Sequence, residues 1–208
     1  MRSERGLDRL LAFSDAVVAI ALTLLVLPLV EVVSGAGDAD SVLDLVADDG
    51  DAFLSFAISF LVIWVLWGNH HAMMEHFSSY DGVVVGLHFV WLLTIVLLPF
   101  TTQLLDAPDG GIDGAAPTYV ATLLVSIGAL VALGTWGRRH PGLLRDGDET
   151  AAWTAAPTGL ATVALLLLAL VVTIAVPAVG VLALFLLFLT GPLERLLASR
   201  RRRRSVAG

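Results

Sequence analysis

A carboxylate lies inside an apolar segment near the start of the chain. In RLLAFSDAVVAIALTLLVLPL, residues 9–29, Asp15 follows Arg9, Phe13 and Ser14. Ionisable side chains are costly inside a membrane span and usually have a function. Asp15 could be a structural hub that accepts hydrogen bonds from neighbouring helices, or a proton-binding group of a coupled transporter. Proton relays normally use several ionisable groups through the membrane, so one acid at a helix end favours the hub.

A second group of polar residues ends the next apolar segment. The run WGNHHAMMEHF, residues 67–77, places His71 and Glu75 four positions apart, on one face of a helix. We do not expect a metal site here, because the HExxH arrangement is absent and no second carboxylate is nearby. We expect Trp67 and one histidine, His70, to act as hydrogen-bond donors instead.

The acceptor for these donors should lie at the same membrane depth. Consecutive membrane helices joined by a short connection run antiparallel, so the end of the second segment is level with the start of the first. This predicts a network of Ser14, Asp15, Trp67 and His70. His88 lies near the start of the third apolar segment, at the same side of the membrane.

The composition indicates that these residues are carried by membrane helices. Of 208 residues, 57% are hydrophobic, and there is no cysteine. A soluble domain of this length does not need so much apolar surface. Segments of about 20 apolar residues can cross the hydrocarbon core. We predict an all-α, polytopic membrane protein with one domain over 1–208 and six spans, at about 8–30, 52–77, 82–105, 117–137, 152–175 and 179–198.

The distribution of arginine orients these spans. With six spans, both termini and the second and fourth connections lie on one side, and all the arginines then fall on that side. The acidic runs 31–51 and 106–113 fall on the other side. By the positive-inside rule, both termini are cytoplasmic, and we expect the plasma membrane of a prokaryote. The run Arg200–Arg204 is interpreted as an anchor at anionic lipid headgroups, not as a nucleic-acid site.

Beyond Asp15, the first segment carries an apolar stripe. Ile20, Leu24 and Leu27 lie at positions i, i+4 and i+7 of a helix, and Thr23 lies beside them. Periodicity alone indicates a core or lipid contact. The sequence contains no GxSxG, no HExxH and no glycine-rich phosphate loop, so we do not expect an enzyme or a cofactor. The carbonyl filter of the common potassium channels, a TVGYG-type loop, is also absent.

Three motifs resemble the prokaryotic relatives of transmembrane protein 175, the endolysosomal potassium channel. RLLAFSD matches the family's signature of an arginine, three residues and Phe-Ser-Asp at the start of the first helix. SFLVIWVLWGNHH and LLPFTTQLL are similar to its second and third helices. The resemblance covers about residues 5–105, and the remainder agrees by hydropathy and helix count.

The resemblance implies a six-helix subunit that assembles as a homotetramer, because the chain has a single Phe-Ser-Asp motif. It implies a potassium-permeable channel whose pore is lined by the first helix, with monovalent cations, membrane lipids and further copies of the chain as partners. Selectivity for potassium over sodium should be modest. Carried over by motif, the constriction would be formed by Ile20, Thr23, Leu24 and Leu27, and a structural polar network by Arg9, Phe13, Ser14, Asp15, Trp67, His70 and His88.

Two alternative functions remain open, a non-catalytic membrane scaffold and a coupled transporter. A proton- or cation-coupled secondary transporter could use Asp15 and His70 as its ionisable groups. Transporters of that class are built from internal repeats with broken helices at the middle of the membrane. Neither feature is clear in this sequence.

Overall fold

The computed structural model describes residues 4–35, 41–105, 112–179 and 182–184. Within these ranges the chain forms helices, and Phe77 and Leu144 form an isolated β-bridge. The elements are α1 (Glu4–Leu24), α2 (Leu27–Gly35), α3 (Val42–Asp48), α4 (Gly50–Met74), α5 (Gly82–Leu105), α6 (Ala115–Arg139), the 3₁₀ turn η2 (Pro141–Leu143), α7 (Asp148–Ala155) and α8 (Leu160–Ala175).

Four stretches of the described chain are long and apolar enough to cross a membrane, and a fifth is a bent pair of helices. The four are residues 4–34, 50–74, 82–105 and 115–139, and the pair is α7 with α8. The prediction of an all-helical membrane protein is therefore confirmed. The sixth predicted span, 179–198, lies almost entirely outside the described residues.

The first span consists of two helices where the sequence pattern indicated one, because Pro28 interrupts it. Proline has no N–H to donate to the carbonyl four residues earlier, here that of Leu24, and its ring crowds that carbonyl. The chain accordingly leaves the α-helix after Leu24 and resumes at Leu27. Backbone N–H groups bridge the interruption, with Val26 donating to Thr23 at 3.3 Å and Val30 to Val26 at 3.2 Å.

The fifth span is bent by 41° between α7 and α8. Pro157 follows directly after Ala156, which adopts the extended conformation that a residue before proline favours. Gly159 then begins α8 with a φ of +75°, a left-handed conformation that suits glycine. The range predicted as one helix, 152–175, therefore contains a short α7 and a separate α8.

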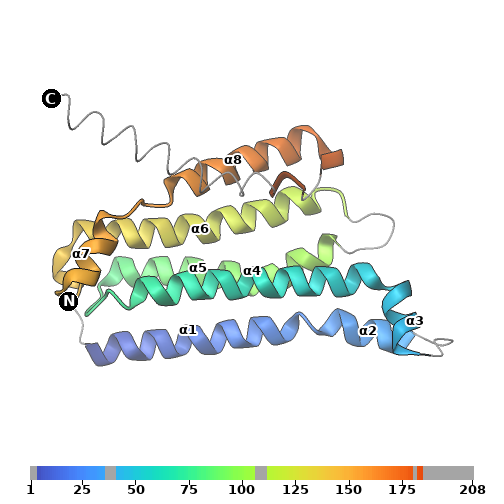
Figure 1. Ribbon diagram of the computed structural model, residues 1–208, viewed down its shortest axis with the longest axis horizontal. Coiled ribbons are helices and arrows are strands. Elements are labelled where there is room, and N and C mark those ends of the chain that lie inside the picture. Colours follow the sequence, from blue (N-terminus) through green and yellow to red (C-terminus); the bar gives the residue numbers. More distant parts are fainter. Residues whose placement is uncertain (1–3, 36–40, 106–111, 180–181, 185–208) are drawn as a thin grey trace.

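The helix α5 lies at the centre of the bundle. It packs against α1, α4 and α6, and α8 packs on the far side of α6. Figure 1 shows the result, with α1 and α8 at opposite sides of the molecule. The face of α1 that meets the bundle is formed by Leu7, Ser14, Val18 and Ala21, all buried and all on one helical face.

The connection after α6 folds back against the connection between α4 and α5. Phe77 and Leu144 form an antiparallel bridge, and the Arg145 N–H donates to the carbonyl of His76 at 2.8 Å. The Arg145 side chain donates to the carbonyl of Phe77 and pairs with Glu4 at 3.1 Å, so it also holds the start of α1. A Cβ at Gly137 would lie 2.5 Å from the Phe77 ring, so this contact requires a glycine.

Asp81 fastens the start of α5 to the end of α6. One carboxylate oxygen accepts from the backbone N–H groups of Val83 and Val84, at 3.0 and 2.9 Å, in the manner of a helix N-cap. The other accepts from the indole N–H of Trp136 at 3.0 Å. Burial raises the pKa of Asp81, but these hydrogen bonds lower it more, so that its pKa is below the ordinary value.

The lowered pKa makes the contribution of Asp81 depend on pH. A group with a depressed pKa in the folded state stabilises the fold above its unfolded pKa, and this stabilisation is lost as the pH falls through its folded pKa. We expect Asp81→Asn to lower stability at neutral pH by about 0.3–1 kcal/mol. The difference from the unchanged protein should shrink in acid, below the ordinary aspartate pKa of about 3.9. Thermal unfolding in detergent from pH 3 to 7 measures this difference in stability.

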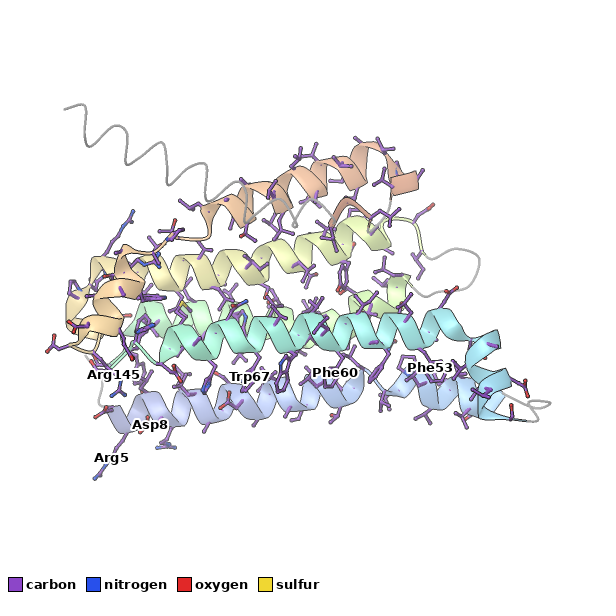
Figure 2. The ribbon with its side chains drawn as sticks, in the orientation of Figure 1. Arg5, Asp8, Phe53, Phe60, Trp67 and Arg145 are labelled. Atoms are coloured by element: carbon purple, nitrogen blue, oxygen red, sulfur yellow. The ribbon has the colours of Figure 1, made fainter. Side chains whose placement is uncertain are left out.

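The matched control is Asp8→Asn, which removes an exposed carboxylate from the same end of the bundle. Figure 2 shows Asp8 there, on α1. An unfolding difference for Asp81→Asn that stays constant over this pH range would contradict the assignment of the charge to the helix cap.

Candidate polar network and exposed face of the first helix

Trp67 and Asp15 join α4 to α1. The indole N–H of Trp67 donates to a carboxylate oxygen of Asp15 at 2.8 Å, and the contact is partly buried. In Figure 2, Trp67 lies on the side of α4 that faces α1. A hydrogen bond to an ionised acceptor is stronger than one between neutral groups. The charge of Asp15 is thus stabilised by a neutral donor from a neighbouring helix.

His70 and His88 join α4 to α5, deeper in the bundle. Their Nε2 atoms are 2.9 Å apart, and each residue is 1% exposed. The His70 ring also stacks on Trp91, with centroids 4.1 Å apart and planes at 10°. These contacts place two imidazoles and an indole in one buried polar layer between neighbouring helices.

The hydrogen bonds of His88 determine which nitrogens carry protons. Its Nδ1 lies 2.9 Å from the carbonyl oxygen of Val84. A carbonyl only accepts, so Nδ1 carries the proton and Nε2 of the neutral ring is an acceptor. His70 must therefore donate from Nε2. This arrangement requires His88 to be uncharged, and it leaves Nδ1 of His70 buried and without a partner among the described residues.

The predicted four-residue network is divided in the structure. Trp67 does bond to Asp15, but His70 bonds to His88. Ser14 is fully buried and donates within its own helix, to the carbonyl of Leu10 at 2.9 Å. The histidine pair has a signal in the sequence, since His70 and His88 lie at similar distances from the connection between two antiparallel helices.

Arg9 and Phe13 are not part of either pair. Both are exposed, and within the described ranges no ion pair joins Arg9 to Asp15. Metal binding has no candidate among the described residues either, because they contain no group of three or more histidine and carboxylate side chains suited to it. His71 and Glu75, 3.8 Å apart, are a pair on the surface.

The residues of the apolar stripe lie on the face of α1 and α2 that points away from the bundle. Ile20 is 60% exposed, Leu24 39% and Leu27 49%. Thr23 is also exposed, and its hydroxyl donates to the carbonyl of Ile20 at 2.7 Å. Since that proton is used within the helix, the Thr23 oxygen presents its lone pairs to the exterior. This face has no protein partner among the described residues of the chain.

Comparison with known proteins identifies a family model for the first half of the chain, relatives over one half to two thirds of its length and a similar fold for almost all of it. The family model of the endosomal/lysosomal potassium channel TMEM175 matches residues 9–99. A potassium channel of Streptomyces collinus is 30% identical over 142 residues, which are 66% of this chain and 67% of that protein. A potassium channel of Chamaesiphon minutus is 37% identical over 108 residues, half of each chain.

Two further relatives extend the comparison. The endosomal/lysosomal proton channel TMEM175 of Danio rerio is 26% identical over 145 residues, 69% of this chain and 27% of that protein. A crystal structure of a variant of the potassium channel MtTMEM175, in complex with a nanobody fusion protein, has a TM-score of 0.64. The two chains are 22% identical, and the aligned region covers 94% of this chain and 93% of the MtTMEM175 chain. This similarity supports the fold. With the Streptomyces relative aligned over two thirds of its length, the chain belongs to the TMEM175 potassium channel family.

Proposed function

We propose that this chain forms a homotetrameric potassium-permeable channel, in which the exposed face of α1 from each subunit lines a central pore. The observation that carries the proposal is the exposure of Ile20, Thr23, Leu24 and Leu27 on one face, opposite the face that packs on α4 and α5. A helix that belongs to the bundle on one side and presents a regular stripe on the other can meet its own copies there.

Four Ile20 side chains around an axis would form the narrowest, most apolar level of such a pore. A hydrophobic constriction can close by losing its water. An ion that crosses it must give up part of its hydration shell, and potassium does so more readily than sodium because its charge density is lower. A filter of this kind favours potassium modestly. The lone pairs of the Thr23 hydroxyl, one turn away, replace part of the lost water.

The charge at the two ends supports an orientation with the start of α1 in the cytoplasm. Figure 2 shows Arg5 and Arg145 at the same end of the bundle. The opposite end carries α3, with Asp44 in its first turn. An arginine-rich end belongs on the cytoplasmic side, and carboxylates at the other mouth would concentrate cations there, an effect that salt screens. We place the channel in the plasma membrane.

We further propose that Trp67–Asp15 and His70–His88 are structural pairs that hold α1 in position for this role. Each bond crosses between helices, at 2.8 and 2.9 Å. Inside the hydrocarbon core water is scarce, and a polar group left without a partner costs several kcal/mol. These pairs fix the rotation of α1 and α4 about their axes and thereby determine which face of α1 is left exposed.

Ile20→Asn tests the pore. An asparagine at the constriction holds water, so we expect several-fold larger potassium flux into liposomes and weaker discrimination against sodium. The matched control is Ile174→Asn on α8, because that isoleucine is similarly exposed, at 63%, but lies across the bundle from α1. Flux and selectivity that are unchanged in Ile20→Asn, or changed equally in both variants, would remove Ile20 from the pore.

A double-mutant cycle tests the pair that joins α1 to α4. Trp67→Phe removes the donor and Asp15→Ala the acceptor, and each should destabilise the protein by about 1.5–3 kcal/mol, the range for a hydrogen bond to a charged group. The double variant should lose little more than either single one, because both remove the same bond. Denaturant unfolding in detergent gives the energies, with Trp64→Phe, an exposed neighbour, as the control. If the loss of stability in the double variant equals the sum of the two single losses, Trp67 and Asp15 are not energetically coupled.

A substitution of Asp15 also distinguishes a channel from a coupled transporter. In a channel, Asp15→Asn weakens the assembly, and the remaining potassium flux stays independent of a proton gradient. A transporter would instead lose proton-driven cation uptake while its oligomer stayed intact. Size-exclusion chromatography and flux assays on the same sample distinguish the two outcomes.

A further inference from the structure

A groove lies on the side of the bundle away from α1. It has a volume of about 510 Å³ and is bounded by the first turns of α5, the last turns of α6 and the first turn of α8. Its walls are apolar, formed chiefly by Val83, Leu87, Val131, Leu160 and Val163. An apolar groove on a membrane protein can hold a lipid tail.

The length of the groove matches one leaflet of a bilayer. Along α6 it extends from Gly128 to Arg139, which at the rise of an α-helix is about 16 Å. The hydrocarbon core is about 30 Å thick, so that one leaflet contributes about 15 Å. An acyl chain lying in the groove would reach from the headgroup region to the middle of the membrane.

The mouth of the groove carries an available positive charge. Arg139 is exposed, and no carboxylate pairs with it among the residues that the structure describes. The guanidinium of its neighbour Arg138 faces Trp153 instead, since one Nη donates to the Trp153 carbonyl at 3.1 Å and the guanidinium carbon lies 4.5 Å from the centroid of the Trp153 ring. A guanidinium recognises a phosphate through two parallel hydrogen bonds. Arg139 is therefore the cation that can meet a lipid phosphate.

The other polar groups at the mouth are compatible with an anion. Trp136 lines the groove, and its indole N–H is held by Asp81, so that the ring lies at the headgroup level where tryptophan is common. The Asp81 carboxylate already accepts three N–H groups.

We propose that this groove binds an anionic phospholipid of the cytoplasmic leaflet, with its phosphate on Arg139 and one acyl chain between α6 and α8. An apolar body with a cationic mouth matches the amphipathic shape and the charge of such a lipid, and basic pockets between membrane helices are known to bind anionic headgroups. A second copy of the chain is a poorer occupant, because α1, the helix with the exposed stripe, lies at the opposite side of the bundle (Figure 1).

The headgroup contact is tested with Arg139→Gln. The purified oligomer is titrated with phosphatidylglycerol or phosphatidylcholine, and bound lipid is counted by native mass spectrometry. The unchanged protein should prefer phosphatidylglycerol, and Arg139→Gln should weaken this binding about tenfold, the value of one charge-assisted contact. Arg5→Gln, which removes an exposed arginine at the same end of the bundle, should leave the preference intact. An equal loss in both variants, or no preference in the unchanged protein, overturns the proposal.

The acyl contact is tested with Gly128→Leu. A Cβ at Gly128 meets no atom within 4 Å, so leucine can extend into the groove without displacing the backbone. Gly86→Leu on α5 is the control, because Gly86 is equally open but does not line the groove. Only Gly128→Leu should reduce lipid binding. If Gly128→Leu leaves lipid binding unchanged, the groove holds no lipid. If Gly128→Leu dissociates the oligomer and the lipid preference is preserved, the groove holds a second copy of the chain.

Discussion

The packing of α5 against three other helices is the constraint on which the rest of the molecule depends. Because α5 is apolar around most of its circumference, it can be buried against α1, α4 and α6 at once. Helix α1 is thereby fixed on one side only, and its other face is left exposed. Helix α6 also packs on α5, and α8 packs against another side of α6. The exposed stripe and the lipid groove lie on opposite sides of this central helix.

Polar bonds between the helices add orientation to this packing. Apolar contacts alone tolerate small rotations of a helix, whereas a hydrogen bond requires two particular atoms to meet. His70 meets His88, and Trp67 meets Asp15, so α4 is oriented toward two neighbours at once. The cap of α5 at Asp81 and the pairing of Arg145 with Glu4 extend this orientation to the end of the bundle.

Much of this fold could be predicted from residue patterns, and the exceptions have physical causes. Apolar length identifies the spans, and Pro28 and Pro157 with Gly159 mark interruptions that hydropathy alone averages away. The positions of His70 and His88 on either side of one connection indicate that they lie at the same level. The pairing of Trp67 rather than a histidine with Asp15 could not be read from the sequence, because the choice of partner depends on helix rotation. The stripe containing Ile20 has the same periodicity whether it faces lipid, core or pore, so the role proposed for it depends on the family resemblance and not on the residue pattern.

The depth of Asp15 follows from the length of the first span. Arg9 and Glu31 are 22 positions apart, about 33 Å at helical rise, close to the thickness of the hydrocarbon core. Each of these charges can therefore reach the headgroups of its own leaflet. Asp15, about 9 Å further in than Arg9 along the same helix, cannot. The indole N–H of Trp67 thus replaces a water molecule as the hydrogen-bond donor to this carboxylate inside the membrane.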